Sequence, residues 1–160
     1  MIDFIYAIPV LAVNREGVTG TGLEYQLKWQ ITEKLMFNGS YAYLDMTDLD
    51  GDPILYRSKH RGQVNVHYQM GLVHIELGIQ AWSKQIYEDF LSNYQIKDGE
   101  IIFPTGELQE RTIPEIVLSK TISSFTGSMH ITNLFDTEYE LIQDFPMPGR
   151  TWQFTLIKTI

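Results

Sequence analysis

Apolar and polar residues alternate along most of this chain with a period of two. The alternation is unbroken from Leu23 to Trp29, and it recurs in the segments that begin at Leu35, Val64 and Val73. Successive side chains of a β-strand point to opposite faces of the sheet, so the pattern predicts strands with one apolar face and one polar face. Helical periodicity is hard to find, and the sequence therefore predicts an all-β fold.

Eight segments carry this pattern or a less regular form of it. They are Ile2–Val13, Leu23–Trp29, Leu35–Tyr43, Val64–Tyr68, Val73–Gln80, Ile116–Leu118, Met129–Ile131 and Trp152–Leu156. Short turns join several neighbouring segments directly, as in β-hairpins. The expected architecture is an antiparallel up-and-down meander of about eight strands.

Two of the tight turns predict how neighbouring strands pair. A two-residue turn at Met70-Gly71 sets Tyr68 opposite Val73, and it continues with Val66 opposite Ile75 and Val64 opposite Leu77. A turn at Ser123-Ser124 sets Leu118 opposite Met129 and Ile116 opposite Ile131. In both hairpins apolar residues meet apolar residues, which a one-residue slip would prevent.

The connections differ between the two ends of the meander. They are tight at Gln30–Lys34 and at the two turns just described, whereas the alternate connections are long. The long ones are Asn14–Gly20, Met46–Lys59, Lys84–Arg111 and Phe135–Pro148. Short turns at one rim and long loops at the other are typical of outer-membrane barrels, whose apolar face lies against lipid. A soluble lipocalin-like barrel, with its apolar face inside, is the alternative.

Charges on the polar face favour the membrane barrel. This face carries Glu24, Lys28, Arg61, Glu76 and Glu115. Charged side chains are costly in the packed interior of a small soluble barrel, whereas a water-filled or plug-filled lumen accepts them. We therefore expect an outer-membrane type of β-barrel, either a partial barrel or a closed small one, with these five charges facing its lumen.

Composition narrows the functional classes further. The 160 residues suit one domain, and the net charge of −8 argues against a nucleic-acid partner. The chain has no cysteine, which excludes disulfides and thiolate metal sites. No segment has the length of an apolar transmembrane helix, and the residues after Met1 lack the basic region of a secretory signal.

Few groups could carry catalytic chemistry. No serine-hydrolase, zinc-protease or phosphate-binding motif is present, so we expect neither an enzyme nor a cofactor. His60 near Asp45 could imitate the acid–histidine pair of an outer-membrane hydrolase, but a polar loop base explains both residues better. The acidic stretch Thr47–Asp52 fails the calcium-loop pattern, and Asp-Gly turn chemistry accounts for it. A weak calcium site shared with another loop stays open.

Two histidines are weak candidates for metal ligands. His67 and His74 face each other across the Met70-Gly71 turn on the polar face, where two imidazoles could reach one ion. No third ligand is evident, so a solvated or hydrogen-bonded pair is the preferred interpretation and no metal is expected. His60 and His130 have no obvious partners.

The long connection Lys84–Arg111 is rich in aromatic residues. It holds Tyr87, Phe90, Tyr94 and Phe103 among acidic residues. Exposed aromatic residues gathered in one loop suggest contact with a ligand. Packing of the loop onto the barrel rim explains them equally well.

The C-terminal part of the chain resembles the TonB-dependent outer-membrane receptors. Asn133-Leu134-Phe135-Asp136, followed by Tyr139, Pro148-Gly149-Arg150 and a final alternating strand, matches the family's C-terminal motif in residues and spacing. Upstream, Gly20–Glu24 and Ser40–Asp45 are also similar to family patterns. The resemblance covers nearly the whole chain and is weakest in Met1–Asn14 and in the loop Lys84–Arg111. The chain departs from the family at Ile160, where an aromatic residue is usual.

This resemblance implies that residues 1–160 are the C-terminal segment of a barrel of about twenty-two strands in the outer membrane of a Gram-negative bacterium. Family members also have a plug domain inside the barrel and a segment that binds TonB, and neither is found in this sequence. The whole receptor would take up a scarce nutrient of the siderophore, haem or cobalamin class. Its partners would be outer-membrane lipid, the plug, TonB through the plug, and the nutrient. The chain would then be a fragment that is not competent for transport alone.

A self-contained eight-stranded outer-membrane barrel with a structural or adhesive role is the second hypothesis. Its closure would require Ile2–Val13 to pair with Thr151–Ile160. Its narrow interior would also have to accommodate the five charges of the polar face.

Overall fold

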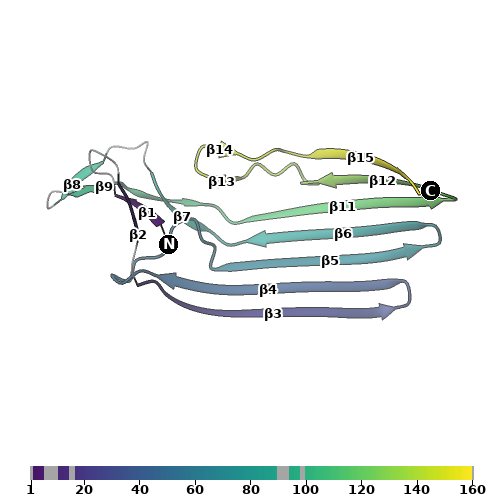
Figure 1. The fold of residues 1–160 in the computed structure, drawn as a ribbon, viewed down its shortest axis with the longest axis horizontal. Helices are drawn as coiled ribbons and strands as arrows, with labels where there is room; N and C mark the ends of the chain where they lie inside the picture. The colour runs from purple at the N-terminus through teal and green to yellow at the C-terminus, as the bar shows by residue number, and fades with distance from the viewer. Residues whose placement is uncertain (1, 6–10, 15–16, 90–93, 98–99, 160) are drawn as a thin grey trace.

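Seven strands form one antiparallel sheet in the computed structural model of the chain (Figure 1). The structure describes residues 2–5, 11–14, 17–89, 94–97 and 100–159. The strands are β3 (Thr19–Thr32), β4 (Leu35–Thr47), β5 (His60–Met70), β6 (Val73–Trp82), β11 (Arg111–Ile122), β12 (Phe125–Thr132) and β15 (Thr151–Lys158). They lie side by side in the order β15-β12-β11-β6-β5-β4-β3, so strands that follow one another among these seven in the chain are hydrogen-bonded neighbours. The predicted all-β antiparallel meander is confirmed.

The remaining strands are short and form four separate two-stranded pairs. These are β1 (Ile2–Ile5) with β2 (Leu11–Asn14), β7 (Gln85–Glu88) with β10 (Thr105–Leu108), β8 (Gln95–Lys97) with β9 (Glu100–Ile102), and β13 (Glu140–Ile142) with β14 (Phe145–Pro146). Within the part of the chain that the structure describes, no helix is long and apolar enough to cross a membrane.

The predicted count of eight sheet strands is wrong by one. The segment expected as the first strand, Ile2–Val13, folds back on itself as β1 and β2, with Ile2 opposite Asn14. Among the described residues, β3 and β15 each pair along one edge only, so the sheet is open. The described residues of Ile2–Val13 therefore do not pair with those of Thr151–Ile160, as a closed eight-stranded barrel would require. The sheet is a partial barrel.

The two predicted hairpin registers have different outcomes. The turn at Ser123-Ser124 is confirmed, with Leu118 opposite Met129 and Ile116 opposite Ile131. The β5–β6 register is wrong by two residues, because the turn lies at Gly71-Leu72 and pairs Met70 with Val73. Gly71 has a φ of 60°, which glycine adopts without the cost that a side chain would add. A shift of two residues keeps every side chain on its face, so alternation alone cannot distinguish the two registers.

The short turns lie at one end of the sheet and the long connections at the other, as the loop lengths predicted. Figure 1 shows the tight turns β3–β4, β5–β6 and β11–β12 at one end of the sheet. The long connections, which contain β7–β10 and β13–β14, lie at the other end. We refer to these as the tight-turn end and the long-loop end.

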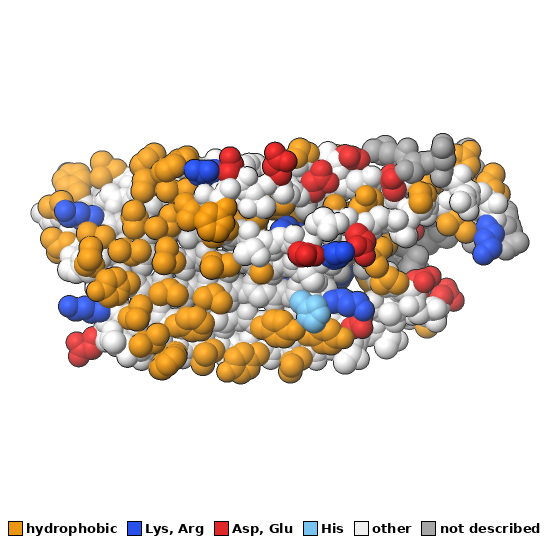
Figure 2. Space-filling model, turned by 180° about the vertical axis from the view of Figure 1, so that it is seen from behind, with side chains coloured by type: hydrophobic (Ala, Val, Ile, Leu, Met, Phe, Trp, Pro, Cys, Tyr) orange, Lys and Arg blue, Asp and Glu red, His pale blue; other side chains and the backbone are white. Residues whose placement is uncertain are grey.

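One face of the sheet is apolar and uncovered. Its exposed members come from all seven strands: Leu23, Tyr25, Leu27, Trp29, Tyr41, Val64, Tyr68, Leu77, Ile79, Ile122, Phe125, Trp152, Phe154 and Leu156. Figure 2 shows hydrophobic side chains spread across this face, with charged side chains toward the two ends. Only Ile54, Leu108 and Ile131 are buried among the large apolar residues of the described chain. The described part of the chain therefore has far less internal core than a soluble domain of this length.

Candidate functional site: the polar face and the cleft at its long-loop end

The opposite face of the sheet gathers the predicted charges into three rows. Glu24, Ala42, Arg61, Trp82 and Arg111 form one row across neighbouring strands. Lys28, Asn38, Asn65, Gly78 and Glu115 form the second row, and Met36, His67, Glu76, Val117 and His130 the third. The five residues predicted to share the polar face thus lie on one face. We call it the polar face below.

Two of these charges have histidine partners. Oε2 of Glu115 lies 3.1 Å from Nε2 of His130, and Oε2 of Glu76 lies 3.4 Å from Nδ1 of His67. The expectation that His130 lacks a partner is therefore wrong. The confirmed β11–β12 register places His130 opposite Val117, so Glu115 is its diagonal neighbour on the same face. The β11–β12 register, which the sequence predicts correctly, was sufficient to predict that Glu115 and His130 are neighbours.

A cleft of about 620 Å³ opens at the long-loop end of the polar face. One wall comes from residues 107–111, where β10 leads into β11, and the other from residues 136–140, 146, 147 and 149. The lining includes Tyr139 and Gly149 of the family motif. The motif therefore borders the cleft as well as the last strand.

The cleft is lined mainly by acidic side chains. It holds Glu107, Glu110, Asp136, Glu138 and Glu140, against one basic residue, Arg111. Lys84 approaches Glu107 to 2.9 Å, and this hydrogen bond raises the pKa of Lys84. Lys84 thereby offsets one carboxylate, and the remaining lining keeps a negative field that repels anions.

Arg111 is the unusual member of the cleft because its charge is buried. The residue is 6% exposed, and its guanidinium carbon lies 5.0 Å from the centre of the Trp82 ring, a cation–π contact. Its Nε and Nη1 atoms are buried and have no hydrogen-bond partner within the described residues. Buried guanidinium groups are normally hydrogen-bonded, since an unpaired buried charge is costly. No motif or pattern in the sequence singles out Arg111, although it shares the alternation phase of Glu115.

Asn133 organises the turn that follows β12. It is 2% exposed and adopts a φ of 50°, a left-handed conformation that asparagine tolerates better than most residues. Its amide nitrogen donates to the carbonyl of Thr137 at 2.9 Å, and its amide oxygen accepts from the Thr137 N–H at 2.9 Å. The same nitrogen lies 3.4 Å from the carbonyl oxygen of Pro148. One buried side chain thus ties the turn to the start of the Pro148-Gly149-Arg150 motif.

Asp136 makes the second tie between the two halves of the motif. Its Oδ1 atom accepts from the N–H of Arg150 at 2.6 Å. Gly149 lies against the same atom, so that a Cβ at Gly149 would lie 2.5 Å from Oδ1. Leu134 donates its N–H to the carbonyl of Pro114 at 2.9 Å, whereas Phe135 is 74% exposed. Asn133 and Asp136, the polar members of the motif, thus hold the backbone just before β15 by hydrogen bonds.

The described aromatic residues of the long loop pack on other aromatic rings. Tyr87 lies in β7 and stacks on Tyr56, with ring centres 6.4 Å apart. Tyr94 and Phe103 meet edge to face at 6.3 Å, and Tyr94 is 56% exposed. Phe90 lies outside the described residues. A ligand contact by these residues stays a prediction.

The other candidates form local structure. Asp48 accepts the N–H groups of Asp50 and Asp52 at 3.0 and 2.9 Å, as expected for turn chemistry in an acidic loop. The Asp45 carboxylate pairs with Lys59 at 2.7 Å rather than with His60. Nδ1 of His60 lies 2.7 Å from the Tyr41 hydroxyl. Asp45 and His60 therefore do not form an acid–histidine pair like that of a hydrolase.

Comparison with solved structures places this sheet among known barrels. The ferripyoverdine receptor of the outer membrane of Pseudomonas aeruginosa, bound to ferripyoverdine, matches with a TM-score of 0.70 and 12% identity over 87% of this chain. The FpvAI–pyocin S2 complex matches with a TM-score of 0.72 and 11% identity, and the FrpB iron transporter from Neisseria meningitidis with 0.65 and 10%. The sheet has the fold of a section of a TonB-dependent receptor barrel.

The chain spans a small part of these TonB-dependent receptors. It covers 19% of the matched chain in the ferripyoverdine receptor and in the FpvAI–pyocin S2 complex, and 23% of the Neisseria transporter. The match therefore concerns one section of a barrel wall. Protein-family models and curated protein sequences give no match.

The contact between Gly149 and Asp136 yields a direct test of the motif. Gly149→Ala inserts a Cβ against Oδ1 of Asp136 and should displace its hydrogen bond to Arg150, at a cost of about 1–3 kcal/mol. Urea unfolding of the chain in detergent, followed by far-UV circular dichroism, should show a lower midpoint. Gly127→Ala is the matched control, because nothing lies within 4 Å of a Cβ at that position. Equal midpoints for the two variants would contradict the proposed tie.

Proposed function

We propose that this chain forms part of the wall of a TonB-dependent outer-membrane receptor for a small-molecule nutrient. The observation that carries the proposal is the uncovered apolar face of a sheet that matches a section of such barrels. On this proposal the apolar face contacts lipid, and the polar face lines the lumen. Glu24, Lys28, Arg61, Glu76 and Glu115 are then lumen residues.

The distribution of exposed apolar side chains supports the lipid contact. Trp29 and Trp152 are 57% and 56% exposed and lie toward opposite ends of the strands. Tryptophan is enriched where a barrel wall meets the two membrane–water interfaces. A contiguous apolar surface of this extent is unusual on a soluble monomer and indicates a partner surface or a membrane.

The open edges support membership in a larger barrel. β3 and β15 each have an unpaired edge among the described residues, and such edges are not tolerated inside a bilayer. Further strands of the complete receptor would pair with both edges. We propose that residues 1–160 are the C-terminal segment of that barrel, as the Asn133–Arg150 motif implies by resemblance.

The charged polar face supports an occupied lumen. Glu24, Lys28, Arg61, Glu76 and Glu115 require water or polar partners, and a plug domain inside the barrel would supply such partners next to the wall. TonB would act through that plug, which places its contact outside this chain.

The acidic cleft favours some nutrients over others. Four carboxylates that Lys84 does not offset, against the one charge of Arg111, disfavour ligands with a high negative charge, such as haem with its propionates or ferric catecholates. Neutral or cationic ligands, such as ferric hydroxamate siderophores or cobalamin, suit the lining better. One structurally similar receptor is known with bound ferripyoverdine and another is an iron transporter, which makes a ferric siderophore the first substrate to test.

The lipid contact can be tested with the three tryptophans of the chain. Three variants each retain one of Trp29, Trp82 and Trp152, with phenylalanine at the other two positions. In vesicles of lipids brominated along their acyl chains, the fluorescence of Trp29 and Trp152 should be quenched. Trp82 should not be quenched, because it lies on the polar face beneath Arg111. Quenching of Trp82 at least as strong as that of the other two would contradict the proposal.

The preferred ligand charge can be tested by titration of the chain in detergent. Trp82 fluorescence should report binding of a ferric hydroxamate siderophore more tightly than haem. Glu110→Gln and Glu138→Gln should each raise haem affinity, by about fivefold at low salt if one charge contributes about 1 kcal/mol of repulsion. Glu33→Gln, in the β3–β4 turn at the far end of the sheet, is the matched control. Tighter binding of haem than of the siderophore, or an equal effect of the control, would refute the preference.

A further inference from the structure

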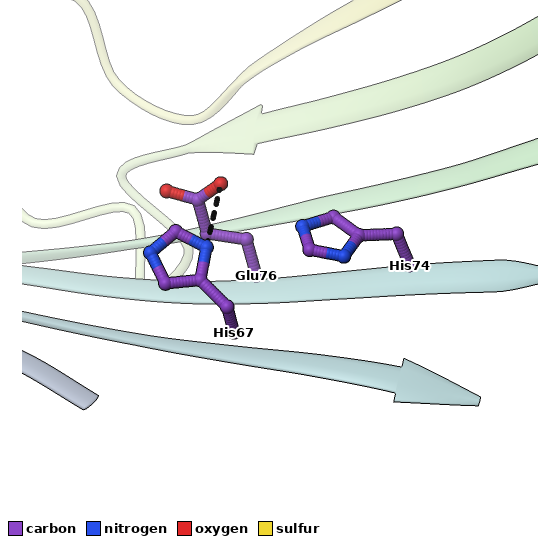
Figure 3. Close-up of side chains that lie close together, drawn as sticks. All are labelled: His67, His74 and Glu76. Atoms are coloured by element: carbon purple, nitrogen blue, oxygen red, sulfur yellow. Dashed lines mark ion pairs between the residues drawn. The ribbon is translucent and has the colours of Figure 1, made fainter. Parts of the chain in front are cut away.

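We infer that His67, His74 and Glu76 form a binding site for a divalent transition-metal ion, of the kind that Zn²⁺ represents. The three side chains lie together on the polar face, near the tight-turn end of the β5–β6 hairpin (Figure 3). The site depends on the pairing of these two strands. It is independent of whether the apolar face contacts a membrane.

The register of β5 and β6 brings the three side chains together. His67 is directly opposite Glu76, and His74 is two residues before Glu76 on the same strand. Side chains directly opposite each other on one face have Cβ atoms about 5 Å apart, within reach of one ion for histidine and glutamate. The register that was expected from a Met70-Gly71 turn would have set Glu76 away from His67 and hidden this third ligand.

The distances suit a metal site. One potential ligand atom from each residue lies within 4.8 Å of the other two. Nδ1 of His67 and Oε2 of Glu76 are 3.4 Å apart. Bonds of about 2.1 Å place two ligands of a tetrahedral ion about 3.4 Å apart. The His67–Glu76 pair already has that spacing, and a small rotation of the His74 side chain brings in the third ligand.

Hydrogen bonding prepares the His74 ring to bind. Its Nδ1 atom lies 3.3 Å from the side-chain oxygen of Gln69, the residue opposite it on β5. An amide oxygen can only accept, so the His74 ring donates its Nδ1–H and keeps an acceptor lone pair on Nε2. In Figure 3 a ring nitrogen of His74 points toward His67 and Glu76. A second partner of this kind fixes the tautomer of most metal-binding histidines.

The surroundings do not compete for the site. The neighbours of His67 and Glu76 in their row are Met36 and Val117, and Ser119 is opposite His74. None of these carries a positive charge that would occupy the Glu76 carboxylate. The side chains of His67 and Glu76 are 20% and 32% exposed, so an ion can enter from the polar face.

The donor set selects the class of ion. Two imidazoles and one carboxylate favour Zn²⁺, Co²⁺, Ni²⁺ or Cu²⁺ over Mg²⁺ and Ca²⁺, which prefer all-oxygen sites. Three protein ligands leave at least one coordination position for water or another ligand. The site is therefore of the open kind.

Zinc titration of the full chain in detergent tests the site. Competition with a chromogenic chelator should give one Zn²⁺ per chain, and Co²⁺ should give visible absorption bands. His67→Gln, His74→Gln and Glu76→Gln should each weaken Zn²⁺ binding at least tenfold, by analogy with the tenfold to hundredfold cost of changing even an outer partner. Gln69→Leu should weaken it by about tenfold through the His74 ring.

His130→Gln is the matched control. It removes a histidine of the same face that also pairs with a carboxylate, Glu115, but has no second histidine beside it. Its zinc affinity should equal that of the unmodified chain, and unfolding in urea should abolish tight binding. Loss of affinity in His130→Gln equal to that in the three ligand variants would overturn the inference. So would tight binding that persists in urea, or a wild-type affinity no better than the variants'.

Discussion

Successive side chains of a β-strand point to opposite faces, and six strand pairings keep most of the large apolar residues of this sheet on one of them. Everything else in the structure depends on that constraint. The apolar face lacks a covering layer among the described residues, and only three large apolar residues are buried. On the proposed function, lipid covers this face and further strands of the receptor pair with the two open edges.

The same alternation arranges the chemistry of the polar face. In the first row of this face Arg111 lies over the Trp82 ring. In the second and third rows Glu115 lies near His130, and Glu76 is opposite His67. The first row ends in an acidic cleft beside the long loops, and the third holds the histidine–glutamate cluster near the tight turns. Two sites of different character thus lie at the two ends of one face.

The fold could be predicted from the sequence because alternation with a period of two assigns each side chain to a face even when the strand register is wrong by two residues. The alternation identified the seven sheet strands and their faces, and the matching of apolar with apolar residues placed the Ser123-Ser124 hairpin in its correct register. The Met70-Gly71 hairpin was placed two residues off, an error that leaves faces unchanged but moves every cross-strand partner. The expected eighth strand failed because Ile2–Val13 finds a partner within itself.

The site was less predictable because it depends on partners rather than on faces. The shared face of the five charges followed from alternation, whereas the Glu76–His67 contact required the exact register. Arg111 is buried against the Trp82 ring of the neighbouring strand, and alternation does not predict how deeply a side chain is buried. The roles of Asn133 and Asp136 depend on backbone groups of Thr137 and Arg150, and no side-chain pattern announces such contacts.

The central claim is that the apolar face contacts lipid while the polar face contacts water. The chain has no cysteine, so single cysteines can be introduced along β6 without background. After reconstitution in vesicles, a membrane-impermeant maleimide should label cysteines at His74, Glu76 and Gln80. Cysteines at Ile75, Leu77 and Ile79 should stay unlabelled until detergent is added. Equal labelling of the two sets, or labelling of the second set alone, would contradict the account.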